Sequence, residues 1–570
     1  MRSLFVMLSF SLSVSSLIAE EVKPQFVRDA VGVKSYASAP RLAERRATTP
    51  AVSLGAASEI VPEEVEAIEV WNREGRLPAK NGFTRPLADP IRVRIADPGR
   101  GAIALSDRGS IIWSGSVEVR SAYRFRLHLT NVELPANTTL WIYGSDGNAI
   151  GFGPELADAN GSLYTPSVAG EIAYIEAEVP AGSHASFDIH DIVELLGPAP
   201  APLDTPSCLV DSTCITPATL TDIASFRHAI AYLQFMHGSS SFVCSGSLLN
   251  DVDDSTTIPY LLTANHCISD QATATSLEAY FDYYTASCGG AFPAISSKPR
   301  ILGSQLLTTG AAPNSDFTLL KLSSMPAGRL LLGWTTSPVA AGTTLYRISH
   351  PFPDSFPQPA PQSFSTTVLV NPASTCSGFP SSTFLYSNYA IGGTYGGSSG
   401  SAVFTSAGQV VGQLYGVCGP APTDGCNATN RAVDGAFANS FPSLQQYLNT
   451  TSTTQCVASA TVVCLNGNRF SVKVDWKRPG GESGQGQAIK YTDNSGLYWF
   501  FGSDNIELLV KVLTGCPLSN TYWVFSAATT NVEYTLTVTD TKTGKIKTYF
   551  NPQGVSAAAI TDTNAFATCP

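Results

Sequence analysis

The distribution of cysteine is the feature that most constrains this chain. All twelve cysteines lie between Cys208 and Cys569, and none occurs in residues 20–207. An even number of cysteines is typical of a protein that forms disulfides in an oxidising compartment. The cysteines therefore divide the 570 residues into a cysteine-free first part and a second part with disulfides, and we expect the two to fold as different domains.

The first 19 residues are typical of a secretory signal peptide. Arg2 precedes an apolar run from Leu4 to Leu17 that only serines interrupt, and Ala19 stands before two acidic residues. This run is too short and too rich in serine for a stable membrane anchor. No later run reaches the ~18 apolar residues that a spanning helix needs, so we expect a secreted, extracellular protein without a membrane anchor.

The composition argues against two classes of binding partner. Only 14% of the residues are charged and the net charge is -11, so no basic face exists to neutralise the phosphates of nucleic acid. A zinc site is the competing interpretation of the cysteines, but no Cys-x-x-Cys pair occurs and the histidines are scattered. We expect a monomer that binds no nucleic acid, metal or cofactor.

Short β-type runs fill the chain on both sides of its centre. Apolar and polar residues alternate in Ile91–Ile95 and Thr139–Tyr143, and again in Phe470–Trp476 and Tyr534–Val538, with Gly, Pro, Asn and Asp between such runs. This pattern predicts antiparallel β-sandwiches. The expected order is a signal peptide at 1–19, a low-order segment at 20–60, a β-sandwich at 61–196, a linker at 197–207, a central β-rich domain at 208–449, a linker at 450–455 and a second β-sandwich at 456–570.

Three motifs in the central domain supply a base, an acid and a nucleophile. His266 ends Thr263–His266, Asp316 precedes the strand-like Phe317–Leu320, and Ser399 lies in Gly396–Ala402. A serine hydroxyl is a poor nucleophile until an imidazole removes its proton, and the imidazole needs a carboxylate to fix its tautomer. Taken alone, each motif has a structural explanation: a buried histidine, a turn aspartate or a flexible Gly/Ser loop. Together they predict a catalytic triad.

The glycines around the serine have a second predicted role. Glycine tolerates the dihedral angles that turn successive backbone N–H groups into one concavity. We therefore expect the N–H groups of Gly397 and Ser399 to form an oxyanion hole for the developing negative charge.

The three motifs, together with Val411–Leu414, resemble those of the bacterial chymotrypsin-type peptidases, and most closely the lysyl endopeptidase group. The resemblance covers residues of about 205–450. It implies an all-β fold, in which a chymotrypsin-like double six-stranded β-barrel is flanked by the N-terminal and C-terminal sandwiches. It also implies that His266 is the general base, Asp316 its orienting acid and Ser399 the nucleophile.

The same resemblance implies a set of disulfides. Three pairs carry over from the lysyl endopeptidase group, and with these assigned, Cys376 and Cys418 are left for a fourth bridge in the central domain. The expected pairs are Cys208–Cys426, Cys214–Cys288, Cys244–Cys267 and Cys376–Cys418. Cys456, Cys464, Cys516 and Cys569 belong to the last domain, and their pairing stays open.

The primary specificity pocket departs from the lysine-cutting pattern. Ala432 stands where the lysine-binding acid is expected, and Tyr415 replaces a histidine after Gly-Gln-Leu. Gly393 stands near the position of trypsin's acid and carries no charge. Asp434 has two interpretations: its carboxylate enters the pocket from a deeper position and favours a basic side chain, or it caps a turn with Gly435, which we favour. We expect the preferred residue not to be lysine.

The junction before the central domain supports this expectation. No lysine or arginine lies between Arg126 and Arg227. Self-cleavage in this segment therefore requires a cut after another type of residue. Leu195, Leu196 or Leu203 would suit a chymotrypsin-like or elastase-like pocket, and another protease remains an alternative.

The flanking domains have less specific patterns. The first sandwich resembles the prodomains of such peptidases, which implies a zymogen, whereas the alternative is a permanent accessory domain. The last domain resembles appendages of other secreted proteins. Its aromatic run Tyr498–Phe501 predicts either sandwich core, which we favour, or a surface that binds polymers.

The sequence thus predicts a secreted serine endopeptidase of the hydrolase class EC 3.4.21, acting on peptide bonds of extracellular proteins through an acyl-enzyme. The alternative is a catalytically inactive binding or adhesion protein that reuses the fold. An esterase of the Gly-x-Ser-x-Gly type is disfavoured, because its Ser, Asp, His order differs from the His, Asp, Ser order here.

Overall fold

The computed structural model describes most of the chain downstream of the expected signal peptide. The described residues are 20–32, 53–56, 62–95, 101–106, 109–135, 138–144, 149–197, 206–253, 256–352, 360–370, 376, 378–449, 456–543 and 545–569. The signal peptide expected at 1–19 and the linker expected at 450–455 lie outside them, as do residues 198–205 of the first linker.

The chain folds into two compact units, and both are nearly all β, as the sequence predicts. The first unit comes from residues 1–250 and 258–444, and the second from residues 251–257 and 445–570. The helices are short: α2 (Pro62–Arg73), α3 (Ile223–Phe226), α4 (Gln271–Thr275), α5 (Phe437–Leu448) and α6 (Cys516–Ser519). No helix among the described residues is long and apolar enough to cross a membrane.

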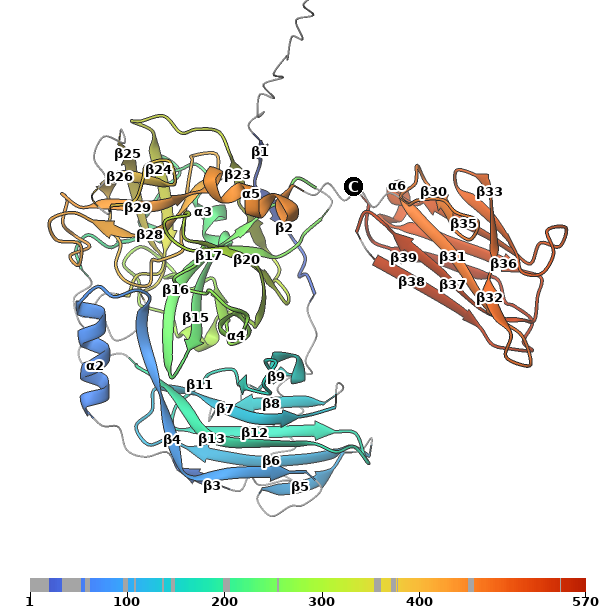
Figure 1. Cartoon of the computed structure of the whole chain (residues 1–570), viewed down its shortest axis with the longest axis horizontal. Coiled ribbons are helices and arrows are strands. Elements are labelled where there is room, and N and C mark those ends of the chain that lie inside the picture. Colours follow the sequence, from blue (N-terminus) through green and yellow to red (C-terminus); the bar gives the residue numbers. More distant parts are fainter. Residues whose placement is uncertain are drawn as a thin grey trace, which may run out of the picture. The chain divides into compact units, whose positions relative to one another are not determined.

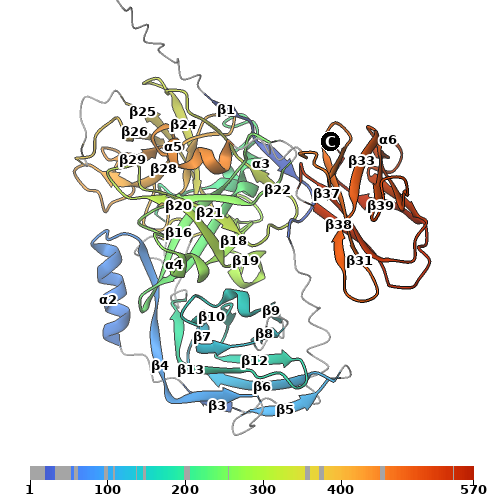
Figure 2. The same ribbon diagram turned by 45° about the vertical axis from the view of Figure 1, so that its right-hand side comes forward.

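The cysteine-free part of the first unit contains two sheets, whose labelled strands are drawn in blue to teal in Figure 2. One sheet contains β10 (Leu163–Tyr164), β7 (Arg124–Glu133), β13 (Ser186–Leu195) and β4 (Ala79–Arg94), with β11 (Val168–Ala169) beside β7. The other contains β3 (Ser53–Ala56), β6 (Ile111–Glu118), β12 (Ile172–Val179), β8 (Thr139–Tyr143) and β9 (Ile150–Phe152), with β5 (Ala102–Leu105) beside β6. Trp113, Phe125 and Phe187 are fully buried in the shared apolar core. We call this sandwich the leader domain.

The central domain contains one closed barrel and one half-barrel. The closed barrel has the order β28 (Gln409–Cys418), β27 (Ala402–Phe404), β24 (Thr344–Ser349), β25 (Ser363–Leu369), β26 (Phe384–Ile391) and β29 (Arg431–Ala436), and pairing of β28 with β29 closes it. β14 (Val210–Asp211) pairs with β25. The half-barrel has the order β20 (Ser304–Gly310), β21 (Phe317–Leu322), β17 (Tyr260–Ala264), β16 (Ser240–Leu249), β15 (Ile230–His237), β18 (Glu278–Phe281) and β19 (Arg300–Leu302).

A strand of the leader domain joins the sheet of the half-barrel. Residues Ala79–Phe83 of β4 pair antiparallel with Ser240–Val243 of β16, so that one sheet continues from the leader domain into the central domain (Figure 1). The central domain has the predicted double-barrel architecture, in which the first barrel is present as a half-barrel with β19 and β20 at its edges.

A buried polar cluster joins the same two domains. The carboxylate of Glu278, on β18, accepts hydrogen bonds from Arg300 Nη1 at 2.9 Å, from the leader's Ser167 N–H at 3.0 Å and from Gln234 Nε2 at 3.0 Å. Arg126 of the leader lies 3.9 Å from the same carboxylate. Burial by itself raises the pKa of Glu278, but Arg126, Arg300 and Arg124 outweigh it and lower the pKa to about 2.

A short N-terminal arm also contacts the central domain. β1 (Glu21–Val22) pairs with β23 (Gly333–Thr335), and β2 (Gln25–Val27) pairs with β22 (Arg329–Leu331). Val22 and Val27 are buried. Glu21–Val22 and Gln25–Val27, in the segment expected to have low order, therefore form strands.

The second unit is a separate β-sandwich. One sheet has the order β30 (Val463–Leu465), β31 (Phe470–Lys477), β37 (Glu533–Asp540) and β38 (Lys545–Asn551), with β32 (Ser483–Gln485) beside β31. The other has the order β33 (Gln487–Thr492), β34 (Ser495–Trp499), β35 (Leu508–Thr514), β36 (Tyr522–Ala528) and β39 (Ile560–Phe566). Tyr498 and Phe500 are buried in its core, whereas Phe501 is 40% exposed.

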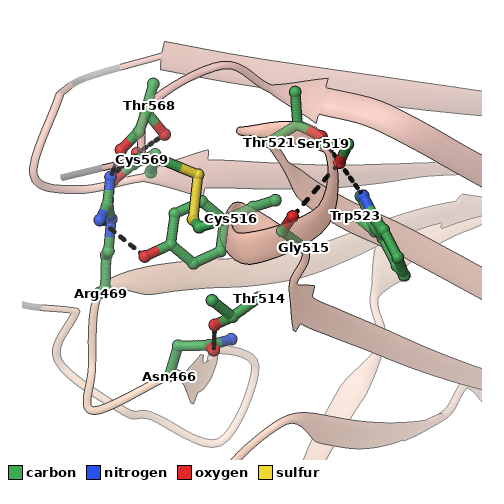
Figure 3. Close-up of a disulfide and its surroundings, with 12 residues drawn as sticks. Asn466, Arg469, Thr514, Gly515, Cys516, Ser519, Thr521, Trp523, Thr568 and Cys569 are labelled. Atoms are coloured by element: carbon green, nitrogen blue, oxygen red, sulfur yellow. Dashed lines mark hydrogen bonds and ion pairs between the residues drawn. A yellow bond between two sulfur atoms is a disulfide. The ribbon is translucent and has the colours of Figure 1, made fainter.

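Covalent and ionic contacts close one end of this sandwich. The structure joins Cys456 with Cys464 and Cys516 with Cys569. Beside the second bridge, Arg469 donates to the Tyr522 hydroxyl at 2.9 Å (Figure 3) and pairs with the buried carboxylate of Asp540 at 2.8 Å. These contacts fix the last residues of the chain against the start of β31.

We expect Glu278→Gln to destabilise the first unit by about 3–5 kcal/mol at neutral pH, because it leaves buried arginines without a counter-charge. The folded pKa lies below the unfolded value of 4.5, so the stabilising contribution is complete above pH ~4.5 and is lost as pH falls towards about 2. Thermal unfolding of the uncut chain across this range measures both effects. The exposed substitution Glu482→Gln is the control, and an equal effect of both substitutions would contradict the prediction.

Candidate active site

His266 and Asp316 meet at the open side of the half-barrel. His266 follows the end of β17 by two residues, and Asp316 immediately precedes β21, which pairs with β17. The imidazole Nδ1 lies 2.7 Å from Asp316 Oδ2, and the backbone N–H of His266 donates to Oδ1 at 3.1 Å. The carboxylate therefore fixes both the orientation of the ring and, while ionised, the proton on Nδ1.

The loop before Asp316 has an unusual backbone that the closed barrel supports. Ser315 and Asp316 have φ angles of 69° and 50°, a region that costs energy for residues with a side chain. Gln413 Nε2 donates to the Ser315 carbonyl at 2.5 Å. A side chain on Gly435 would come within 1.7 Å of that carbonyl oxygen, so glycine is required for this close approach.

A disulfide joins the histidine segment to the neighbouring strand. Cys267 is bonded to Cys244 of β16, and the structure likewise joins Cys208–Cys426, Cys214–Cys288 and Cys376–Cys418. The side chains of Cys244, His266 and Cys267 lie close enough together to suggest a metal site. Both sulfur atoms are committed to the disulfide, however, and thiolates are the form in which cysteine binds zinc.

Ser245, the residue after Cys244, holds the serine loop. Its N–H donates to the Ser399 carbonyl at 2.8 Å, and its hydroxyl donates to the Gly397 carbonyl at 3.0 Å. Gly397 has a φ angle of 86°. Among the hydrogen bonds of the described residues, none uses the N–H of Gly397 or of Ser399, so both donors are available to an oxyanion.

The reactive atoms of the base and the serine are also without partners. His266 Nε2 is buried and makes no hydrogen bond with any described residue. Ser399 is 2% exposed, and its hydroxyl has no hydrogen bond within the described part of the chain. A side chain on Gly400 would contact Thr263 and Ala264, which places the serine loop against the strand that leads to His266.

Tyr415 covers the histidine. Its ring lies edge-on to the imidazole with 5.6 Å between centroids, and it packs against Phe379 and Phe384. Burial and the Asp316 carboxylate raise the pKa of the Tyr415 hydroxyl. An uncharged aromatic side chain therefore limits the access of water to the Asp–His pair.

Of the four residues expected in the specificity pocket, Tyr415 lies on β28, and Ala432 and Asp434 lie on the neighbouring strand β29. Tyr415 lines a cavity of about 170 Å³ that also contacts Ser399. Gly393 packs against Gly425 and Cys208, and Ala432 is fully buried in β29.

Asp434 has neither of the two roles considered from sequence. It lies within β29, fully buried, with Oδ1 2.5 Å from Arg347 Nη2. Arg347 in turn donates to the Ser401 carbonyl at 2.8 Å. The carboxylate thus supports the backbone behind the serine loop, instead of facing a substrate or capping a turn.

Leader residues line the cavity next to Ser399. Its lining residues from the leader are Asn72, Glu74, Gly75, Arg76, Leu77 and Ala79, and those from the central domain include Tyr395, Gly396, Tyr415 and Gly416. We call residues 74–78 the leader loop. Asn72 and Lys80 flank this loop and close it. The Asn72 side chain donates to the Lys80 carbonyl and accepts from the Lys80 N–H, each at 2.9 Å.

Three supporting residues were missed from sequence: Ser245, Gln413 and Gly435. The Gly-Gln-Leu motif contains Gln413 and belongs to the resemblance, but the motif itself does not indicate the contact with Ser315. Ser245 follows a cysteine of the bridge beside His266, which is the only local signal for it. The partner of each residue lies far away in the sequence, so its role depends on the tertiary structure.

We expect Gly397→Ala to reduce turnover by roughly a hundredfold to a thousandfold through loss of an oxyanion donor. The new Cβ would lie 2.8 Å from the His350 carbonyl oxygen, so the loop must move. Gly342→Ala is a matched control, because Gly342 has the same φ angle of 86° and no atom within 4 Å of the new Cβ. Peptide hydrolysis and thermal unfolding of both variants test this, and equal turnover would contradict it.

The comparisons with known proteins agree with this geometry. Residues 204–434 match the family "Lysyl endopeptidase, C-terminal domain". A lysyl endopeptidase of Pseudomonas aeruginosa is 28% identical over 334 residues, which cover 54% of this chain and 69% of that protein.

Two solved structures give weaker matches. The active form of the Rv3671c protease from M. tuberculosis is 12% identical, with 46% of this chain and 97% of that chain covered and a TM-score of 0.28. A structure described as GrC is 16% identical, with 42% and 99% covered and a TM-score of 0.31. The fold assignment rests on the strand pairing and not on these scores. The family match and the relative confirm that the central domain resembles the lysyl endopeptidases of the chymotrypsin type.

Proposed function

We propose that this chain is a secreted serine endopeptidase, produced as a zymogen, that hydrolyses peptide bonds of extracellular proteins. The observation that carries the proposal is the Asp316–His266 hydrogen bond of 2.7 Å beside a serine loop with two free N–H groups. The six disulfides agree with an oxidising, extracellular environment.

The proposed mechanism assigns one task to each group. His266 Nε2 takes the proton of the Ser399 hydroxyl as the oxygen attacks the peptide carbonyl, and Asp316 stabilises the imidazolium that forms. The N–H groups of Gly397 and Ser399 bind the oxyanion. His266 then gives its proton to the leaving amine, and water hydrolyses the acyl-enzyme with His266 as the base.

The preferred side chain before the cleaved bond is proposed to be uncharged. The carboxylate of Asp434 is already paired with Arg347, and Ala432 supplies no charge at the position where the lysine-cutting relatives have an acid. A basic substrate side chain would therefore lose its hydration without gaining a counter-charge.

The leader loop is proposed to keep the uncut chain inactive. Its residues occupy the side of the cavity next to Ser399, where a peptide substrate must bind. Leu77 lies against Gly416, with its Cδ1 3.5 Å from the position that a Cβ on this glycine would take. Trp71 Nε1 donates to the Pro78 carbonyl at 2.9 Å, which adds a second restraint on the loop.

Maturation would then require a cut before the central domain. Leu195 is buried at the end of β13, and the N–H of Leu196 donates to the Asn81 carbonyl at 2.8 Å. Neither residue can enter a protease cleft without leaving the leader sheet. Of the three leucines considered from sequence, Leu203 is the one that we propose as the cleavage site, and it lies outside the described residues.

We expect Ser399→Ala to abolish cleavage of a mixed peptide library, with a loss on the order of a millionfold. Mass spectrometry of the products and of the protein's own N-terminus gives both specificity and the maturation site. Cuts after apolar residues agree with the proposal. Cuts after Lys or Arg that disappear in Asp434→Asn would contradict the assignment of Asp434. If neither the parent protein nor Ser399→Ala cleaves any peptide after its leader is removed, an inactive binding protein is favoured.

We expect Asn72→Ala to expose Ser399 in the uncut chain, because the two hydrogen bonds between Asn72 and Lys80 that close the leader loop are lost. The rate at which a fluorophosphonate labels Ser399, identified by peptide mapping, should rise several-fold. The exposed asparagine substitution Asn564→Ala is the control. An unchanged rate in Asn72→Ala, with labelling as fast as in the leader-free enzyme, would contradict inhibition by the leader loop.

A further inference from the structure

The leader domain contains a second Ser-His-Asp arrangement, separate from His266 and Ser399. His128 Nδ1 lies 2.8 Å from Asp191 Oδ1, and His128 Nε2 lies 2.8 Å from the Ser162 hydroxyl. These are the two contacts that activate a serine nucleophile: a carboxylate on one ring nitrogen and the hydroxyl on the other.

The sheet places the three side chains together. β10, β7 and β13 are neighbours in this order; Ser162 immediately precedes β10, and His128 lies on β7 opposite Asp191 of β13. The register of β13 against β7 shifts between Ile189 and Asp191. This bulge turns Asp191 to the face of His128, and bulges commonly re-aim side chains at functional sites.

Further contacts fix the serine and the imidazole. The His128 ring stacks on Tyr164 with 4.3 Å between centroids and 10° between planes. The Ser162 carbonyl accepts from the Asp158 N–H at 2.8 Å, and the Ser162 N–H donates to Asp158 Oδ1 at 2.9 Å. With Asp191 ionised, the proton of the imidazole lies on Nδ1, so Nε2 accepts the Ser162 hydroxyl proton.

The serine opens into a cavity of its own. This cavity has a volume of about 270 Å³, and Ser162 lines it together with Leu156, Tyr164, Met236, His237 and Asp270. The side chains of His128 and Asp191 are 16% and 22% exposed, so the group is accessible to a small molecule. The apolar part of the wall suits a short acyl chain.

One difference from Ser399 limits the substrate class. The N–H of Ser162 is already used by Asp158, so it is not free to stabilise an oxyanion in the way proposed for Ser399. A substrate must therefore have a good leaving group, as an aryl ester does and an amide does not.

We propose that Ser162, His128 and Asp191 form a second acyl-transfer centre that hydrolyses small aryl esters. The Ser162 oxygen forms a bond to the ester carbonyl carbon while its proton moves to His128 Nε2. The bond from this carbon to the aryloxy group then breaks, and the aryloxide takes the proton from His128. Water attacks the acyl-serine with His128 as the base, releases the carboxylic acid and restores Ser162.

The test uses the uncut, full-length Ser399→Ala protein, in which the first serine cannot react. With p-nitrophenyl acetate we expect release of p-nitrophenol and an acetyl group on Ser162, located by mass spectrometry of peptides. Adding Ser162→Ala or His128→Gln should lower the rate at least roughly tenfold, since a positioned general base contributes about a hundredfold or more. Ser183→Ala and the exposed substitution His184→Gln, in the same domain, are the matched controls and should leave the rate unchanged.

A structural role of the three residues is tested separately. Asp191→Asn should slow acetylation of Ser162 in the Ser399→Ala protein, while the melting temperature identifies any variant that has lost its fold. If Asp191→Asn unfolds, labelling of Ser162 by a fluorophosphonate in the Ser399→Ala protein decides instead. Ester hydrolysis that is equal with and without Ser162, or absence of any acyl or phosphonyl group on Ser162, overturns the proposal.

Discussion

The hydrogen bonds of Ser245 are the interaction on which the active-site region depends. Its N–H and hydroxyl hold the carbonyls of Ser399 and Gly397, its carbonyl accepts from Thr263 at 2.9 Å, and its hydroxyl accepts from the His350 N–H at 2.9 Å. One buried residue thus connects the serine loop, the strand before His266 and the closed barrel. Because these groups are buried, loss of one hydrogen bond leaves its partner unsatisfied, at a cost of about 1–3 kcal/mol.

The sequence predicts the all-β fold class well, because this class depends on local patterns, whereas the identity of the reacting groups stays a prediction. Period-two alternation identifies the strands. The prediction for Ser399 rests on glycines that are next to it in the sequence. The supporting contacts were not predictable in the same way. Arg347 pairs with Asp434 across 87 residues, and Ser245 meets Gly397 across 152 residues, so neither partner could be assigned without the barrel. Asp434 illustrates the difference: its sequence context favours a turn cap with Gly435, whereas the carboxylate lies fully buried within β29 and pairs with Arg347.

The contacts between the leader and central domains could not be predicted from sequence patterns either. The linker composition of residues 197–207 indicates where the chain crosses, but it carries no information on the pairing of β4 with β16. The interface combines backbone pairing and the buried Glu278 cluster with apolar contacts, among them those of Val193 and Leu195 with Met236. These contacts join segments that lie far apart in the sequence, so local patterns could not predict them.

The N-terminal arm gives the leader a second attachment to the central domain. β1 and β2 pair with β23 and β22, and the sandwich begins only at β3, after residues 33–52. A single cut within residues 197–207 therefore divides the chain without releasing either product from the other. The arm and β4 would still bind the enzyme as two linked ligands, and each raises the effective concentration of the other. Release of the leader then depends on how fast both contacts are broken at the same time. A second cut between the arm and the sandwich would convert one bivalent ligand into two weaker, independent ones.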